Sequence, residues 1–378
     1  MTATSTQPDQ PSEFRSIAET LQLDARQIAY ARLAGVRNAQ DFYSFLVAAP
    51  ELGQQGLFDT PDITERLIRE TAVASMVQRA ERSARPDTVS FGATAPSEAV
   101  YGEVGTPAPE ITEAEVRSLS SFARGPLADE DPVEAIRCPP WPVRDQGSRG
   151  TCVAFATTAA YELHLCRTQS LSIDLSEQFL YWAIKHHRLD SIPHDDGTRH
   201  ASATTALDRF GICAEAQWPY DPTFRTLVSH DPPPPGAAGA ALAHQTSLPA
   251  ATAHSATQGK AAALLAKLRT HNGVAIALPV FDAPSGRTNN WTTRAAQTFG
   301  EVQNPLPGWS VSGGHAVCCI GFQPDIHEPL GGHFIIRNSW STLWGHGLPD
   351  AAYAGPEPGY GQVSASYVDR YLWEDCVF

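Results

Sequence analysis

The feature that most constrains the fold is a short turn followed by a long run without glycine or proline. In RDQGSRGTCVAFAT, residues 144–157, Gly147 and Gly150 permit a tight backbone turn. The residues from Cys152 to about Leu165 are mostly small or apolar and contain neither glycine nor proline. This pattern predicts a largely buried helix that begins at Cys152 and against which the rest of a domain must pack.

The first residue of this expected helix carries a thiol. A cysteine at a helix N-terminus lies at the positive end of the helix dipole, which favours the thiolate. Gln146, six residues before Cys152, can place a side-chain amide beside the same turn, as an oxyanion hole requires. A small cysteine buried in a helix explains this stretch equally well, so the stretch alone leaves both interpretations open.

Two later segments supply the partners that a cysteine nucleophile needs. In SGGHAVCCIGF, residues 312–322, His315 follows two glycines and begins a β-like run. In FIIRNSWSTLWGHG, residues 334–347, Asn338 and Trp340 follow a β-like run and enter a loop. A thiol nucleophile requires a base, and the base requires a third group that fixes its tautomer. Cys152, His315 and Asn338 can fill these three roles.

From about Pro142 to the C-terminus the chain resembles the papain-like cysteine peptidases. Five segments match in order: PVRDQG with Cys152 and AFA, LSEQ at 175–178, WPY at 218–220, GGHAV at 313–317 and RNSW at 337–340. The resemblance implies an α+β fold of two lobes. A helical lobe would carry the nucleophile on a central helix, and a β-barrel-like lobe would carry the histidine and the asparagine.

The resemblance also assigns roles to residues of this chain. Cys152 would be the nucleophile, His315 the general base and then acid, and Asn338 the residue that orients the imidazole. Gln146 would form the oxyanion hole together with the backbone N–H of Cys152. Substrate-binding residues are expected at Gly197, Thr198, Gly314 and Trp340.

Two of these substrate-binding positions have more specific expectations. Gly197 matches a glycine whose backbone pairs with substrate, and Thr198 stands where a second glycine is usual. Trp340 would shield the hydrogen bond between His315 and Asn338 from water. Neither a metal nor a cofactor is expected.

The sequence departs from the family signature C-G-[SA]-C-[WY] beside the nucleophile. Arg149 replaces the first cysteine, so the disulfide usual at this place cannot form, and Val153 replaces the aromatic residue. The expected function is a thiol endopeptidase that works through an acyl-enzyme. A catalytically silent binding protein on the same fold is one alternative. A transglutaminase-like acyltransferase is another, although such a site prefers Asp where Asn338 stands.

The chain divides into three expected parts: a small all-α module at 1–84, an extended linker or pro-segment at 85–135, and a papain-like peptidase domain at 136–378. Capping-box spacings at Asp24 with Gln27 and at Asn38 with Asp41 predict two helices of the first part, and a third is expected from about Pro61 to Ser83. The N-terminal region either inhibits the peptidase as a zymogen or binds a protein partner as an adaptor. An irregular surface insertion is expected from Asp231, where the sequence reads DPPPPGAAGAALAHQTSLPAATAHSATQ.

The composition limits the partners. The formal net charge of −14 and the absence of a basic run argue against nucleic-acid binding, so a protein or peptide substrate is expected. No apolar run is long enough to span a bilayer, and the polar N-terminus lacks a signal-peptide pattern. The seven cysteines include no CxxC pair. With the lost disulfide, these features predict a bacterial-type protein in a reducing cytoplasm, with non-classical secretion left open.

Overall fold

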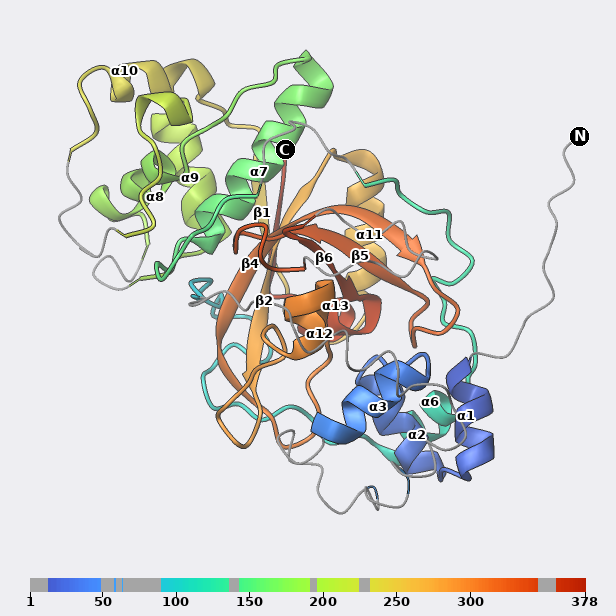
Figure 1. The fold of residues 1–378 in the computed structure, drawn as a ribbon. Coiled ribbons are helices and arrows are strands. Elements are labelled where there is room, and N and C mark those ends of the chain that lie inside the picture. The colour runs from blue at the N-terminus through green and yellow to red at the C-terminus, as the bar shows by residue number, and fades with distance from the viewer. Residues whose placement is uncertain are drawn as a thin grey trace, which may run out of the picture.

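The computed structural model describes residues 13–48, 58, 63, 90–135, 143–190, 196–223, 232–345 and 358–378. A group of helices, α7 to α10, lies beside a strongly curved sheet, and the N-terminal helices lie at the opposite end of that sheet (Figure 1). This is the two-lobed α+β arrangement that the sequence predicts, preceded by an all-α module. The third helix expected at 61–83 lies outside the described residues, apart from Ile63.

The helical lobe is built around α7 (Cys152–Gln169), which begins at the residue predicted from sequence. Helix α8 (Glu177–His186) begins after Ser176, whose hydroxyl accepts a hydrogen bond from the backbone N–H of Phe179 at 3.0 Å. This capping interaction satisfies one of the free N–H groups of the first turn. The lobe also contains α9 (His200–Phe210), α10 (Ala237–Ala241) and the 3-10 turns η1 (Glu215–Gln217) and η2 (Leu242–His244).

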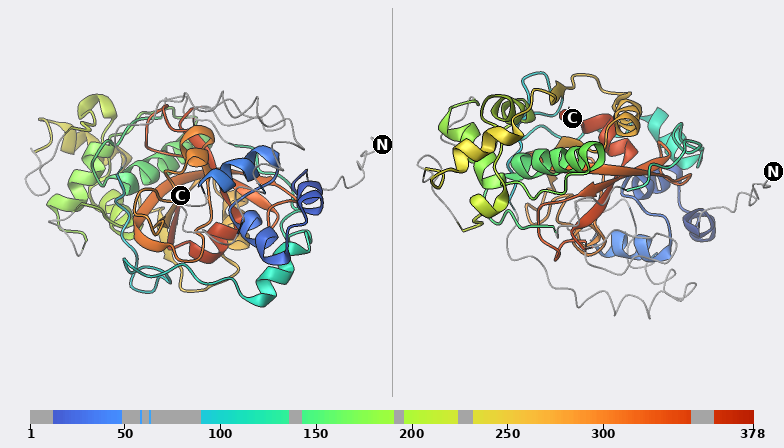
Figure 2. Two further views of the ribbon diagram at one scale, coloured as in Figure 1. Left: turned by 60° about the horizontal axis from the view of Figure 1, so that its bottom comes forward. Right: turned by 90° about the horizontal axis from the view of Figure 1, so that it is seen from above.

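The second lobe is a seven-stranded sheet with the order β1-β7-β2-β4-β5-β6-β3. Its strands are β1 (Ala250–Ala253), β2 (Val274–Asp282), β3 (Glu301–Val302), β4 (Ser310–Pro324), β5 (Gly332–Arg337), β6 (Tyr360–Ser364) and β7 (Glu374–Val377). Helices α11 (Lys260–Thr270), α12 (Arg294–Phe299) and α13 (Ala365–Tyr371) complete the lobe. Helix α7 packs against β2 and β4, and Figure 2 shows it lying along one face of the sheet.

The N-terminal module contains α1 (Glu13–Leu21), α2 (Ala25–Leu33) and α3 (Ala39–Ala48). The capping box predicted at Asp24 and Gln27 is present, and Asn38 caps the backbone N–H of Asp41 at 2.9 Å. The module lies against the β lobe (Figure 2). Arg37 forms an ion pair of 2.5 Å with Glu301 of β3, which joins residues far apart in the sequence.

Residues 90–135 follow the surface of the β lobe and bond to its strand edges. Gly105 donates to the carbonyl of Val311 at 2.8 Å, and Val133 exchanges two backbone hydrogen bonds with Phe322. The expectation of a wholly extended segment is wrong, because residues 113–120 form helix α6 (Glu113–Ser120). This helix has its own capping box between Thr112 and Glu115 and packs against α2.

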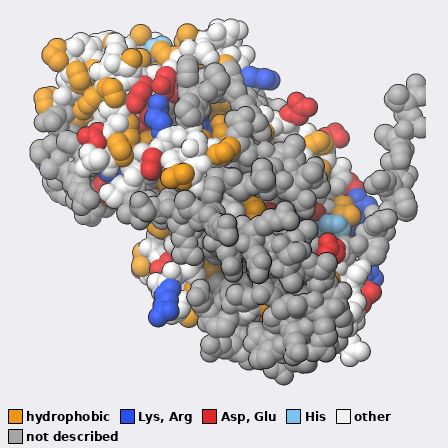
Figure 3. Space-filling view, in the orientation of Figure 1, with side chains coloured by type: hydrophobic (Ala, Val, Ile, Leu, Met, Phe, Trp, Pro, Cys, Tyr) orange, Lys and Arg blue, Asp and Glu red, His pale blue; other side chains and the backbone are white. Residues whose placement is uncertain are grey.

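The Pro/Ala-rich insertion is more regular than the sequence indicates. It contains α10, whose Ala237 and Ala241 are buried, and β1, which pairs with β7. Backbone hydrogen bonds to an existing strand stabilise β1, so it needs no apolar alternation of its own. Over α8 to α10, the face in Figure 3 carries hydrophobic side chains interspersed with acidic and basic ones.

Two further observations bear on the expected environment of the chain. In the described part of the chain, no helix has both the length and the apolar character needed to cross a membrane. Cys166, at the end of α7, is disulfide-bonded. The argument for a reducing compartment from absent disulfides therefore does not hold for this chain.

Candidate active site

The predicted nucleophile lies at the junction of the two lobes. Gly147 adopts a φ of +61° in the turn before α7, a conformation that side-chain-bearing residues rarely adopt. The turn leads into α7, and Cys152, its first residue, is completely buried. Several backbone amides lie close enough to the Cys152 sulfur to favour its charged form. They include the amide of Ala316, which follows His315 on β4, and those of Gly92 and Ala93.

The predicted base and its orienting residue are in contact. His315 Nε2 lies 2.7 Å from Asn338 Oδ1, and the same oxygen accepts the backbone N–H of Ser339 at 2.8 Å. Because a backbone N–H can only donate, Oδ1 is the acceptor in both contacts, and His315 Nε2 carries a hydrogen. In neutral imidazole the other nitrogen, Nδ1, is then the proton acceptor. Nδ1 is buried and has no hydrogen-bond partner among the described residues.

Aromatic rings enclose the imidazole of His315. Trp340 stacks on it with ring centroids 4.3 Å apart and an interplanar angle of 24°. Trp291 and Phe91 meet it edge-on at 4.9 and 5.8 Å. Trp340 therefore covers one face of the imidazole that is hydrogen-bonded to Asn338.

The side chain of Gln146 is fixed at both ends. Ser339 Oγ donates to its Oε1 at 2.5 Å, so Nε2 must be the end that donates. Nε2 is directed at the carbonyl of Arg149 at 2.8 Å and the carbonyl of Ser90 at 3.0 Å. Gln146 thus presents an amide donor to a peptide carbonyl in the cleft, which is the property of an oxyanion-hole donor.

Residues 90–94, Ser90 to Thr94, lie across the residues expected to bind substrate. We call them the cleft segment. Its backbone pairs with Thr198, which donates to the carbonyl of Gly92 at 2.8 Å and accepts from Thr94 N–H at 2.9 Å. The carbonyl of Gly314 accepts from Gly92 and Ala93 at 3.0 and 2.9 Å. The four predicted substrate-binding residues therefore surround a segment of the chain itself.

The contacts also separate the roles of Gly197 and Thr198. Thr198, rather than Gly197, makes the backbone pairs with the cleft segment. Gly197, with φ +89°, instead permits close approach, because a Cβ there would lie 2.6 Å from the carbonyl oxygen of Gly92. At Gly314 a Cβ would meet the ring of Trp373 at 2.2 Å, so only glycine fits beneath the segment.

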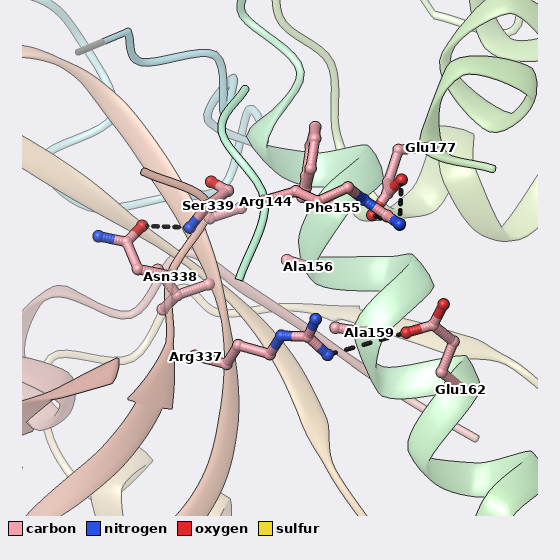
Figure 4. A pocket seen from close by; sticks show the side chains of 11 residues that line it. Arg144, Phe155, Ala156, Ala159, Glu162, Glu177, Arg337, Asn338 and Ser339 are labelled. Carbon is pink, nitrogen blue, oxygen red and sulfur yellow. Dashed lines mark hydrogen bonds and ion pairs between the residues drawn. The ribbon is translucent and has the colours of Figure 1, made fainter. Parts of the chain in front are cut away.

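Behind the candidate catalytic residues, a polar cavity lies between α7 and β5 (Figure 4). Arg144, two residues before Gln146, donates to both carboxylate oxygens of Glu177 at 2.6 Å. Arg337, directly before Asn338, lies 3.8 Å from Glu162 of α7. Burial raises the pKa of Glu162 to about 8 against the opposing effect of Arg337. These pairs attach the strands and turns that carry Gln146 and Asn338 to the helical lobe.

Cys152 and His315 are both neutral near pH 7 in this structure. Burial raises the pKa of the Cys152 thiol to about 11, although nearby backbone amides oppose the shift. Burial lowers the pKa of His315 to about 4, against the opposing effect of its hydrogen bond to Asn338. Between these values neither group is charged, so the covered site lacks a thiolate.

This predicts a pH profile for alkylation of the full-length chain. Only the thiolate reacts with iodoacetamide, and the Cys152 pKa is raised to about 11. The rate should therefore rise roughly tenfold per pH unit between pH 7 and 10. Modification of the Cys152 peptide is followed by mass spectrometry, with the unfolded chain, in which cysteine titrates near about 8.5, as control. A folded profile that is flat above pH 8 would contradict the prediction.

Several functional contacts were not foreseen from the sequence. Ser339 contacts Gln146; it lies within the RNSW segment, but that segment gave it no role. Trp291 contacts His315, and nothing in its local sequence pattern marks it. The cleft segment reaches Gly314 across more than two hundred residues, so local sequence patterns carry no signal for it. Among the described residues, no group of three or more His, Cys, Asp or Glu is placed to hold a metal ion.

Comparison with known families agrees with this geometry. Residues 134–348, more than half of the chain, match the model of a family described as papain family cysteine protease. An uncharacterized peptidase C1-like protein of Acanthamoeba polyphaga mimivirus is 24% identical over 204 residues, which are 53% of this chain and 60% of the viral protein. The match thus spans about three fifths of that relative's length.

A solved structure shows the same fold. Xylellain, a cysteine protease from Xylella fastidiosa, superimposes with a TM-score of 0.52 at 20% identity, over 79% of this chain and 97% of the other. Digestive procathepsin L 3 of the Tenebrio molitor larval midgut has a TM-score of 0.41 at 17% identity, over 89% and 98% of the two chains. At these identities the likeness to xylellain establishes the fold alone.

Proposed function

Because the chain belongs to the papain family of cysteine proteases, we propose that it is a cysteine endopeptidase held inactive by its cleft segment. Cys152 is the nucleophile, His315 the base and Asn338 the group that fixes the imidazole. Gln146 Nε2 and the backbone N–H of Cys152 bind the oxyanion. The observation that carries the proposal is the hydrogen bond from Gln146 Nε2 to the Ser90 carbonyl, since an oxyanion donor must present its N–H to a peptide carbonyl oxygen in this way.

The chemistry proceeds in two steps. The thiol proton passes to His315 Nδ1 while the sulfur attacks the substrate carbonyl, and the oxyanion is held by Gln146. The C–N bond then breaks as His315 returns the proton to the leaving amine, which leaves an acyl-enzyme. Water, deprotonated by His315, attacks the thioester, and release of the carboxylic acid regenerates the thiol. Atoms and protons balance without a cofactor.

The contacts of the cleft segment support a zymogen. The segment uses Thr198, Gly314 and Gln146, which are the groups that a substrate backbone would need. Phe91 packs on both His315 and Trp340 with centroid distances of 5.8 and 5.5 Å. Burial keeps the thiol neutral, against the opposing effect of the segment's backbone amides at Gly92 and Ala93. Peptide substrates are therefore excluded until the segment leaves the cleft, whereas an adaptor role for the N-terminal helices would leave the cleft open.

The direct test follows the purified full-length chain over time. It is incubated with a reductant over a range of pH, and self-cleavage between residues 85 and 137 is mapped by mass spectrometry. Peptide hydrolysis is assayed before and after. Hydrolysis that appears with self-cleavage and is blocked by an epoxide-type thiol inhibitor such as E-64 supports the proposal. Hydrolysis at full rate by the uncut chain would contradict the zymogen, and no hydrolysis under any condition would contradict the endopeptidase.

A further inference from the structure

The turn before Cys152 is held by a buried arginine. Arg149 is only 4% exposed, although charged side chains are rarely buried to this extent without partners. It stands where the family signature has a cysteine. Its guanidinium donates to Gln178 Oε1 at 2.7 Å and to the carbonyl of Asp221 at 2.8 Å. Two segments of the helical lobe are thereby fixed to the turn.

Two tyrosine rings complete the environment of the guanidinium. Its central carbon lies 4.8 Å from the centre of the Tyr220 ring and 5.5 Å from that of Tyr181. Such cation–π contacts gain strength when they are shielded from water. A planar guanidinium can donate in its plane while its faces contact rings, which the compact ammonium of a lysine cannot reproduce.

The same turn carries the proposed oxyanion donors. The backbone carbonyl of Arg149 accepts from Gln146 Nε2 at 2.8 Å and from the N–H of Thr151 at 2.9 Å. The hydroxyl of Tyr220 donates to the carbonyl of Gln146 at 2.8 Å and lies 2.8 Å from Thr151 Oγ1. Movement of the arginine therefore moves the acceptor that directs the Gln146 amide.

Tyr181 also connects the surroundings of Arg149 to the wall of the cleft. Tyr181 donates to Asp196 Oδ1 at 2.9 Å, and Asp196 Oδ2 accepts the N–H of Gly150 at 3.3 Å. Asp196 immediately precedes Gly197 and Thr198. The nucleophile turn and the substrate-binding backbone are thus joined through non-covalent contacts around one guanidinium.

We propose that Arg149 is a positioning residue that aligns the oxyanion donors Gln146 and Cys152 N–H with the substrate carbonyl. This rests on the proposed peptidase function. An arginine that acts on the oxyanion affects the transition state, in which the negative charge is present, more than the bound substrate. Its loss should lower kcat and leave KM nearly unchanged.

The test compares Arg149→Lys with the wild-type full-length chain, after the incubation in which the wild type becomes active. We expect kcat to fall about 10- to 100-fold, part of the 10²–10³ that one oxyanion donor contributes, with KM within about threefold. A peptide aldehyde, whose adduct with Cys152 carries an oxyanion, should lose affinity in parallel with kcat/KM. The affinity for the same peptide as a primary amide should be unchanged. The rate of Cys152 alkylation by iodoacetamide should also be unchanged.

Two further variants keep the test decisive. Arg209→Lys changes an exposed arginine on the ring of Phe210, away from the cleft, and should behave as wild type. If Arg149→Lys does not fold, Tyr220→Phe removes the hydroxyl contacts to Gln146 and Thr151 and should show the same selective loss of kcat. An unchanged kcat in either folded variant overturns the inference about Arg149 and leaves the proposed peptidase function standing. A wild-type chain that never cleaves peptides overturns the proposed function, and the inference with it.

Discussion

Replacing Cys152 with alanine is expected to abolish peptide cleavage, with a loss of at least about 10⁴ in kcat/KM. The physical reason is that no acyl-enzyme can form without the sulfur, while the oxyanion donors and the binding backbone stay in place. The same variant should take up no E-64-type inhibitor, and self-cleavage between residues 85 and 137 should stop. Hydrolysis of a fluorogenic peptide and the intact mass of the chain measure these effects.

The matched control is Cys213→Ala. Cys213 is also a fully buried free thiol of the helical lobe, but it lies beside Ser176 rather than in the cleft. Its replacement should leave kcat/KM within about threefold and inhibitor uptake at one molecule per chain, since small buried substitutions far from a site act mainly on stability. If Cys152→Ala still cleaves peptides, the assignment of the nucleophile is wrong.

Replacing Gly92 with valine is expected to activate the full-length chain without any cut. A Cβ at this position would lie 2.2 Å from the carbonyl oxygen and 2.4 Å from the Cα of Gly150. These are backbone atoms of the nucleophile turn, so they cannot move aside as a flexible side chain would. The cleft segment must then leave, which opens the Thr198 and Gly314 backbone and rehydrates the thiol.

The expected gain is at least about tenfold in the initial rates of peptide hydrolysis and of Cys152 alkylation at pH 7, in line with the rise in thiolate per unit fall in thiol pKa. Gels of the same samples show whether the chain is still intact. Val104 is 74% exposed and lies in the same stretch of residues 90–135. Val104→Ala should therefore have the hydrolysis and alkylation rates of the wild type. A folded Gly92→Val protein with wild-type rates would show that the segment does not inhibit, and would favour an adaptor role for the N-terminal region.

What the sequence predicted well was local in origin. The capping box at Asp24 and the start of α7 at Cys152 each depend on residues within one or two helical turns. Helix α6 could have been found in the same way, since Thr112 and Glu115 have capping-box spacing. It was missed because the surrounding Pro- and Gly-rich composition dominated the interpretation.

The candidate site was predictable only in its recognisable motifs. His315 and Asn338 were identified from short segments, and the structure brings them within 2.7 Å. Trp291 and the cleft segment reach His315 through tertiary contacts, which depend on how the strands pair rather than on any local pattern. The strand β1 was missed for the same reason, because its order comes from β7.

The cleft segment and the catalytic groups belong to one chain, and this sets how hard the segment is to displace. A tethered ligand competes at an effective concentration on the order of millimolar. Free substrates at micromolar concentrations would rarely win that competition, whatever their intrinsic affinity. A single cut in the chain between the cleft segment and the peptidase domain makes binding of the segment bimolecular, so that dilution favours its release. The activity of such a molecule would therefore be timed by bond cleavage, and the supply of substrate would have little influence on when it begins.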